Sequence, residues 1–278
     1  MASSLDIPQR APAGRRATEA RNQAARLRHP HRWERVFERA LAYGEAAGEA
    51  LAETLWPTRC AVCDAPGEAL CPACLRNLSY LDWWRACPRC GAPFGRVQCS
   101  ECNPVAMAAL DRTEPPFDAC ASAVVYDDAA ARIVRTWKDA GERRIVESMA
   151  DLMAPVTAPS WRAERPAIVP VPATAAAVRR RGFDHGADLA RALAERLGLE
   201  EAPLLARPRS ADQRSLARRG RIRNMEGRFK PLPGASAPAS VLIADDVFTT
   251  GATLFAASDA VRAAGARHVR CITFARVW

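Results

Sequence analysis

Short apolar runs and stretches with helical spacing alternate along the chain from residue 118 to residue 278. Continuous runs of about four to eight apolar residues are typical of strands covered on both faces, whereas apolar residues that recur every three or four positions indicate helices. The pattern predicts three helical segments. The first covers 129–156 and is broken near Gly141, and the second covers 185–199 and is closed by Gly198. The third runs from about Leu254 through Ala264. The expected strands are 119–126 ("ACASAVVY"), 167–172 ("AIVPVP"), 241–244 ("VLIA") and 268–277 ("HVRCITFARV").

Strands that alternate with helices predict an α/β fold in residues 118–278, with a mostly parallel sheet and helices on both faces. Cys120 and Cys271 fall within expected strands, so we expect them to be buried core thiols. The segment 104–117 contains "EPPF" and is expected to be a linker in front of this domain.

The N-terminal region has a different composition. Residues 1–31 are rich in Ala and Arg and contain few large apolar side chains. Such a segment buries too little apolar surface to fold, so we expect a disordered basic tail, with a nucleic-acid-binding arm as the alternative. Residues 32–56 carry apolar residues at roughly helical spacing from Trp33 to Trp56, which predicts a helix that Pro57 ends.

Eight of the ten cysteines form four C-x-x-C pairs within residues 57–103. Tetrahedral zinc needs two such pairs, so this segment is expected to be a double zinc ribbon with two structural four-cysteine sites. An iron-sulfur cluster is the main alternative, and redox C-x-x-C chemistry is a weaker one. Sequential pairing of the knuckles is the simplest arrangement, although the spacing also allows interleaving. The expected ligands are Cys60, Cys63, Cys71, Cys74, Cys87, Cys90, Cys99 and Cys102.

Charge and hydropathy limit the possible environments. The formal net charge is +9, and it falls to about +5 if eight thiolates bind two Zn²⁺ ions. The longest stretch without a charged residue spans 14 residues, Pro231 to Ala244, and contains three prolines, so no membrane insertion is expected. The N-terminal segment lacks the apolar run of a signal peptide. We therefore expect a cytoplasmic protein.

The stretch "VLIADDVFTTGATL", residues 241–254, combines a short apolar run, two aspartates and a Thr/Gly segment before an expected helix. Ligands of open α/β sheets bind at the carboxyl ends of strands, where Asp245 and Asp246 are expected to lie. A helix start offers unpaired N–H groups, and Gly251 allows close approach of a phosphate. This pattern indicates a site for a phosphorylated sugar or a metal. The alternative is that the two acids only cap the helix.

These residues are similar to the phosphoribosyl pyrophosphate (PRPP) loop of type I phosphoribosyltransferases. Further segments resemble the ComF family, competence-associated phosphoribosyltransferase-like proteins with an N-terminal double zinc ribbon. The resemblance covers about residues 50–277. The supporting segments are "WPTRCAVC", "VRTWKDAGERR", "VPVP", "RRRGFDHGADLA" and "DQRSLARRGRIRNMEGRF".

The resemblance implies that Asp245 and Asp246 are the catalytic pair that holds the ribose hydroxyls, and that PRPP binds together with Mg²⁺. Arginine and lysine side chains suit contacts with phosphate. For Arg179, Arg180 and Arg181, the alternative is that they form a solvated basic helix start. Asp184 stands where the family usually has Asn, and His185 is a candidate polar contact. The other residues implied to bind PRPP are Lys138, Arg179, Arg180, Arg181, Thr249, Thr250, Gly251, Ala252 and Thr253.

The most basic segment, residues 207–230, has nine Arg or Lys residues against two acidic ones. In the family this segment resembles a flexible hood that is associated with single-stranded DNA. A basic groove attracts phosphate backbones without reading the sequence, and a loop that closes over PRPP would use the same charges. The residues expected to contact nucleic acid are Arg214, Arg218, Arg219, Arg221 and Arg223.

The resemblance thus predicts a glycosyltransferase that transfers a 5-phosphoribosyl group and releases pyrophosphate, in a protein associated with DNA uptake. The acceptor is unknown, and the sequence offers no obvious general base. The alternative is a non-catalytic competence factor that binds single-stranded DNA and uses PRPP only as a ligand or regulator. Other competence proteins are possible partners.

Overall fold

The computed structural model describes residues 57–208 and 227–278. The tail expected over 1–31, the helix expected over 32–56 and the five arginines expected to contact nucleic acid, Arg214 to Arg223, lie outside the described residues. Residues Thr58–Trp278 form one compact unit.

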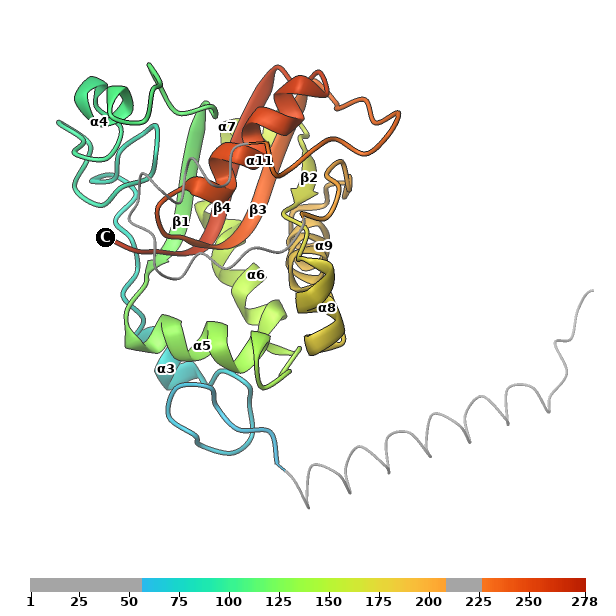
Figure 1. Cartoon of the computed structure of the whole chain (residues 1–278). Helices are drawn as coiled ribbons and strands as arrows, with labels where there is room; N and C mark the ends of the chain where they lie inside the picture. Colours follow the sequence, from blue (N-terminus) through green and yellow to red (C-terminus); the bar gives the residue numbers. More distant parts are fainter. Residues whose placement is uncertain (1–56, 209–226) are drawn as a thin grey trace, which may run out of the picture. The chain divides into compact units, whose positions relative to one another are not determined.

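A four-stranded parallel sheet forms the centre of this unit (Figure 1). Its order is β1-β4-β3-β2, so the two strands that come last in the chain lie in the middle. This parallel sheet confirms the predicted α/β class. The strands are β1 (Ala119–Val125), β2 (Ala167–Pro170), β3 (Ser240–Phe248) and β4 (His268–Arg276).

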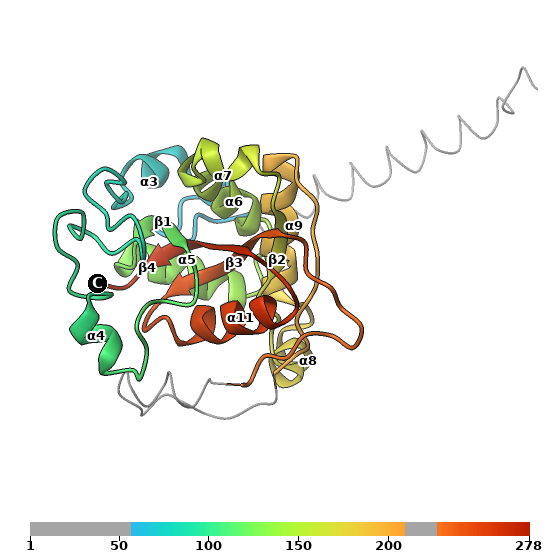
Figure 2. The same cartoon turned by 90° about the horizontal axis from the view of Figure 1, so that it is seen from above.

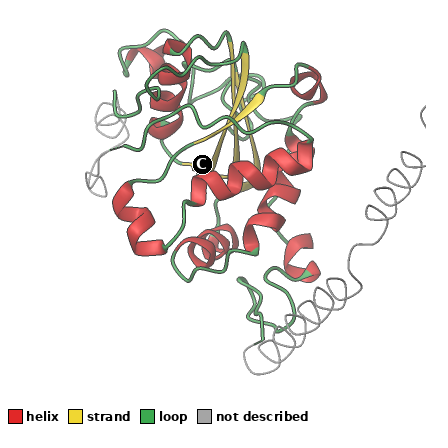
Figure 3. Ribbon diagram, turned by 90° about the vertical axis from the view of Figure 1, so that its right-hand side faces the viewer, coloured by secondary structure: helices red, strands yellow, loops and turns green. Residues whose placement is uncertain are grey.

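Helices cover both faces of the sheet, as Figure 2 shows with α6 and α11 on opposite sides. The helices α6 (Ile145–Val156) and α9 (His185–Leu197) pack on one face, and α5 (Asp128–Lys138) contacts α6. The opposite face is covered by α11 (Ala252–Ala263). Figure 3 shows the strands grouped together among the helices and loops.

Alternation along the strands divides the core between the two faces. Leu242 and Ala244 pack into the cluster on the α6 and α9 side, whereas Val241 and Ile243 pack on the α11 side. Because successive strand residues point to opposite faces, a strand covered on both sides is a continuous apolar run. All four residues are fully buried.

Two segments differ from the sequence prediction. The third strand does not end at Ala244: pairing with β4 continues from Asp245, opposite Thr273, to Phe248, opposite Arg276. The aspartates therefore lie within β3, because backbone pairing extends the strand past the apolar run. The expected linker 104–117 contains α4 (Pro104–Ala108) and fully buries Met107 and Phe117, so it packs against the domain.

The cysteine-rich segment packs against the edge of the sheet beside β1. Leu81 N–H donates to Ala123 O at 3.0 Å, and Val125 N–H donates to Ser79 O at 2.8 Å. This short antiparallel contact separates the first knuckles from the second. Three more short helices are α3 (Pro72–Arg76), α7 (Pro159–Ala163) and α8 (Ala175–Arg181).

Candidate metal centres and anion-binding site

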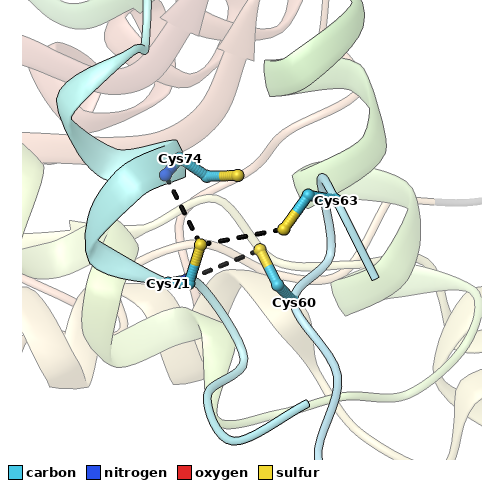
Figure 4. A group of neighbouring side chains, drawn as sticks. All are labelled: Cys60, Cys63, Cys71 and Cys74. Atoms are coloured by element: carbon cyan, nitrogen blue, oxygen red, sulfur yellow. Dashed lines mark hydrogen bonds between the residues drawn. The ribbon is translucent and has the colours of Figure 1, made fainter. Parts of the chain in front are cut away.

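The eight cysteines of the C-x-x-C pairs gather into two groups of four, in which the sulfurs lie within 4.8 Å of one another. The grouping is sequential, and it places the first two knuckles together and the last two together. Figure 4 shows the first group with its four sulfurs turned toward a common centre. The first group is Cys60, Cys63, Cys71 and Cys74, and the second is Cys87, Cys90, Cys99 and Cys102.

The sulfur spacing fits zinc. A tetrahedral centre with Zn–S bonds of about 2.3 Å places its sulfurs about 3.8 Å apart. Cys63 and Cys71 have their sulfurs 3.7 Å apart in the first group. In the second group, the sulfurs of Cys90 and Cys99 are separated by 3.5 Å. The two groups are therefore consistent with two zinc sites.

Within the first group, backbone amides favour ionisation of Cys60, whereas burial and the neighbouring cysteines raise the pKa of Cys74 to about 12. Cys71 N–H donates to Cys60 Sγ at 3.4 Å, and Cys74 N–H donates to Cys71 Sγ at 3.5 Å. Burial opposes ionisation of Cys60, but N–H donors from Cys71, Cys63 and Val62 outweigh it and lower its pKa to about 6. The thiolate form, which is the metal ligand, is thus accessible at neutral pH.

The two groups differ in exposure. Cys63 of the first group is exposed, whereas Cys87 and Cys90 of the second are buried. The first group packs with the core cluster of the α6 side, and the second packs with the cluster of the α11 side. Each ribbon is therefore part of a different hydrophobic core.

A hollow of about 370 Å³ lies at the carboxyl end of the sheet. Its walls come from the loop after β2, from the end of β3, from the start of α11 and from the residues that end α5 and begin α9. Parallel sheets bind ligands at this edge. The described residues that line it include Lys138, Val171, Pro172, Ala173, Thr174, His185, Pro208, Phe229, Asp245, Asp246, Thr249 and Thr253.

Two of the lining residues form an ion pair. Lys138 Nζ donates to Asp246 Oδ2 at 2.5 Å, and the two side chains are 16% and 10% exposed. Burial would raise the pKa of Asp246, but the Lys138 ammonium and a hydrogen bond from Asp245 lower it to about 2. Asp246 therefore carries a full negative charge at neutral pH.

Asp245 differs from its neighbour. Burial, and then the charge of Asp246, raise the pKa of Asp245 well above its usual value. Its Oδ1 accepts the backbone N–H of Asp246 at 2.9 Å. Two adjacent acids in a buried site titrate as a coupled pair, so Asp246 ionises well before Asp245.

His185 faces the same hollow from the first turn of α9. Its ring meets the Trp137 ring edge-on with centroids 5.7 Å apart, and Arg181 Nη1 lies 3.2 Å from its Nδ1. Burial, followed by the positive charge of Lys138, lowers the pKa of His185 to about 4. The imidazole is neutral at physiological pH. Because a guanidinium only donates, Nδ1 accepts and Nε2 carries the proton.

The Thr/Gly segment forms the turn between β3 and α11. Gly251 has φ of +82° and occupies the N-cap position without a side-chain cap. A Cβ at Gly251 would come within 2.9 Å of the Phe248 ring, so only glycine fits without displacement. This turn leads the chain into a 12-residue helix, whose first amides and dipole favour an anion.

The opposite wall is fixed by Asp184. Its Oδ1 accepts the backbone N–H groups of Gly186 at 3.0 Å and of Ala173 at 3.3 Å, which caps α9 and ties down the loop after β2. Its Oδ2 forms an ion pair with Arg207 at 2.5 Å. Both oxygens thus have partners in the protein, and the carboxylate has a positioning role.

The structure brings together Lys138, Asp245, Asp246, Thr249 and Thr253 on the lining of the hollow. Thr250 and Gly251 lie in the turn before α11, and Ala252 is the first residue of that helix; these three are not among the lining residues. The three arginines of α8 are divided. Arg179 and Arg180 are exposed and away from the described lining, and Arg181 pairs with Asp139 at 3.1 Å.

Sequence reasoning missed the anchor Arg207, which forms the ion pair with Asp184. Thr174 caps α8 by accepting Ala177 N–H at 3.1 Å, a pattern that a Thr before an Ala-rich helix could have indicated. No local signal pairs Arg207 with Asp184, because the two lie far apart in the chain.

Comparison with known proteins identifies the ribbon segment. Residues 51–104 match the family model of the double zinc ribbon domain. No curated protein matches the chain. Among the described residues, none of the helices is long and apolar enough to cross a membrane.

Proposed function

We propose that the chain binds PRPP through the hollow at the end of β3 and transfers its 5-phosphoribosyl group to an acceptor, with release of pyrophosphate. The observation that carries this proposal is the juxtaposition of a carboxyl pair with a glycine turn at a helix start, on one edge of a parallel sheet. Carboxyl groups suit ribose hydroxyls, and turn amides suit a phosphate.

Each part of PRPP has a candidate partner. Asp245 and Asp246 accept hydrogen bonds from the ribose hydroxyls, and Asp245 also donates one when protonated. The turn from Thr249 to Thr253 holds the 5′-phosphate. Lys138 contacts the pyrophosphate, because its ammonium lies on the lining of the hollow. The neighbouring His185 is neutral, so Lys138 supplies the positive charge there.

The charges also suit the chemistry. Departure of pyrophosphate breaks the bond from its oxygen to the anomeric carbon and leaves positive charge on the ribose. A fixed carboxylate such as Asp246 stabilises that charge, and a fixed cation such as Lys138 stabilises the leaving polyanion. The free protein holds the two groups as a mutual ion pair at 2.5 Å, so the ligand phosphates compete with Asp246 for Lys138.

Mg²⁺, when bound with PRPP, supplies further neutralisation of the pyrophosphate. The metal-binding groups among the described residues are the two four-cysteine sets, and Asp246 is already paired with Lys138. We therefore expect the magnesium to enter with the phosphates and not to occupy a protein site of its own. Two zinc ions are proposed to fill the cysteine groups as structural centres.

Calorimetric titration of the zinc-loaded chain with PRPP, with and without Mg²⁺, tests the proposal. The double substitution Asp245→Asn and Asp246→Asn is expected to abolish binding, because it removes the charge and the paired acceptors. Asp151→Asn is the matched control, since Asp151 is an exposed carboxylate that pairs with Arg196 outside the hollow. Equal PRPP affinity in the double variant and in the wild type would refute the proposal.

Catalysis needs a separate measurement. Pyrophosphate release from PRPP, followed with a panel of amine and hydroxyl acceptors and with water alone, distinguishes transfer from simple binding. Binding without release for any acceptor would leave PRPP as a ligand and would contradict the transferase activity. The association with DNA uptake comes from the sequence resemblance, and the residues expected to contact DNA lie outside the described chain.

A further inference from the structure

Arg276, the last residue of β4, has no ion-pair partner among the residues that the structure describes. The residue is only 1% exposed, and its Nη1 donates to Cys90 O at 2.8 Å. The ion pairs observed within residues 57–208 and 227–278 do not include Arg276, and its buried Nε has no partner there. A buried guanidinium without an anion is strongly unfavourable, so a counter-charge is required.

The second cysteine group supplies that counter-charge when it holds zinc. Four thiolates around one Zn²⁺ ion carry a net charge of about −2, and such a centre needs neighbouring donors or cations. Arg276 Nη2 lies 3.9 Å from the sulfur of Cys90, one of the four ligands. The guanidinium thus faces the buried centre directly, where screening by water is weak.

The first cysteine group differs in this respect. Its nearest comparable contact is from Arg132, whose Nη1 donates to Val62 O at 2.9 Å. Arg132 is exposed, and Cys63 is exposed as well, so water screens charge at this centre. Among the described residues, Arg276 and Arg132 thus each donate to a carbonyl inside a C-x-x-C knuckle, and the two contacts differ mainly in burial.

Arg276 also touches the turn that bounds the candidate anion site. Its Cζ lies 3.9 Å from the centroid of the Phe248 ring, a cation–π contact in a buried position. Phe248 directly precedes Thr249, and a Cβ on Gly251 would come within 2.9 Å of its ring. The ring is therefore enclosed between the guanidinium and the turn.

We propose that Arg276 is the buried counter-ion of the second zinc centre and that, through Phe248, this metal centre holds the turn 249–253 in place. The ribbon then has a role beyond its own folding, because zinc occupancy at one centre determines the geometry of the anion site. Only the consequence for PRPP affinity depends on the function proposed above. The links to zinc and to the turn do not.

Zinc release from the fully loaded chain tests the first link. The wild type, Arg276→Met and the matched control Arg132→Met are mixed with a chromogenic chelator, and the release phases of the two ions are recorded. Loss of the counter-ion is expected to accelerate one of the two phases about tenfold or more, and the control is expected to leave both phases unchanged. Unchanged phases in Arg276→Met would overturn the counter-ion assignment.

Hydrogen exchange tests the second link without any ligand. The peptide that covers residues 248–254 is expected to exchange faster in Arg276→Met, while peptides from α9 keep the wild-type rate. Phe248→Leu keeps the cation and removes the ring, so it is expected to accelerate exchange in the turn and to leave zinc release unchanged. Faster zinc release without faster exchange in the turn would overturn the coupling.

A substitute variant and a separate affinity measurement complete the zinc-release and exchange experiments. If Arg276→Met does not fold, Arg276→Lys serves, because it keeps the charge and loses the planar contacts. It is expected to release zinc faster than the wild type, and an unchanged rate would overturn the counter-ion assignment. PRPP affinity is measured in the same variants. A wild type that does not bind PRPP would refute the proposed function, while zinc release and exchange would still decide this inference.

Discussion

The Lys138–Asp246 ion pair gives the sharpest test of the electrostatics of the site. Asp246→Asn preserves the size of the side chain and removes its charge, so Lys138 loses its anion at a position where the two side chains are only 16% and 10% exposed. The unpaired ammonium remains in the hollow beside a neutral imidazole. The variant is therefore expected to be less stable than the wild type.

The magnitude follows from the pKa of Asp246. The pair lowers this pKa from 3.8 to about 2, and one pKa unit corresponds to about 1.4 kcal/mol. The charged form is thus stabilised by about 2 to 3 kcal/mol relative to the unfolded chain. For a unit of this size, such a loss lowers the melting temperature by roughly 5 to 10 °C.

The pH dependence has a definite sign. Because the folded-state pKa of Asp246 is depressed, its contribution is complete above the unfolded value of 3.8 and is lost as the pH falls toward about 2. Work at about pH 7.5 keeps every ordinary carboxyl group ionised and avoids loss of zinc by protonation of its ligands.

Urea unfolding of the zinc-saturated protein measures the effect. Asp245→Asn is the matched control: burial and the charge of Asp246 raise the pKa of Asp245, asparagine resembles the protonated acid, and its Oδ1 can still accept Asp246 N–H. This control is expected to change stability by less than about 1 kcal/mol. Lys138→Met combined with Asp246→Asn is expected to recover most of the loss, because the unpaired charge is gone.

Either of two results would show that the Lys138–Asp246 ion pair does not stabilise the protein. One is a wild-type stability in Asp246→Asn alone. The other is a double variant whose loss of stability equals the sum of the losses in Asp246→Asn and in Lys138→Met. Additive losses would mean that the two side chains do not interact.

Three further predictions follow from the same structure. The pKa of His185 is about 4 in the folded state and 6.5 in the unfolded state, so unfolding takes up a proton between these values and stability falls as the pH drops through this window. In urea unfolding measured from pH 7 to 4.5, His185→Gln is expected to reduce this loss of stability by about 2 to 3 kcal/mol. An imidazole NMR titration near pH 6.5 in the folded protein would contradict this. Gly251→Ala introduces a side chain at φ +82° and within 2.9 Å of the Phe248 ring, so it is expected to lower the free energy of unfolding in urea by about 2 kcal/mol. The control is Gly141→Ala, because Gly141 has a similar φ of +78° and open space around it. This control is expected to lower the free energy of unfolding by about half as much. Elemental analysis is expected to find about two zinc ions per chain. Removal of both with a strong chelator is expected to reduce the near-ultraviolet circular dichroism, to which the T-shaped pair of Trp83 and Trp84 in the ribbon segment contributes. An unchanged signal in metal-free protein would contradict a structural role for zinc.

Local patterns were sufficient to predict the four strands and the longer helices of the described residues. Continuous apolar runs located the strands, helical spacing located α5, α6, α9 and α11, and the four C-x-x-C pairs located both four-cysteine groups. These signals work because burial on two faces, amphipathic packing and tetrahedral thiolate coordination each impose a spacing on the sequence itself. The length of β3 was missed, since its end depends on pairing with β4 and not on its own apolar residues.

Contacts between distant residues could not be predicted in the same way. Lys138 and Asp246 are 108 positions apart, and Arg276 and Cys90 are 186 apart. Such partners are chosen by the strand order, which places β4 and β3 in the centre of the sheet and brings the C-terminal residues next to the second ribbon. A single sequence indicates that a charged residue needs a partner, but the fold determines which partner it meets.

A titration of the zinc-loaded, ¹⁵N-labelled chain with PRPP and Mg²⁺, observed through its backbone amide resonances, tests the central claim most directly. The account predicts saturable shifts concentrated at Asp245, Asp246 and the turn from Thr249 to Thr253, with the β1 edge unaffected. Saturable shifts confined to other parts of the chain, or the absence of any shift at millimolar PRPP, would contradict it.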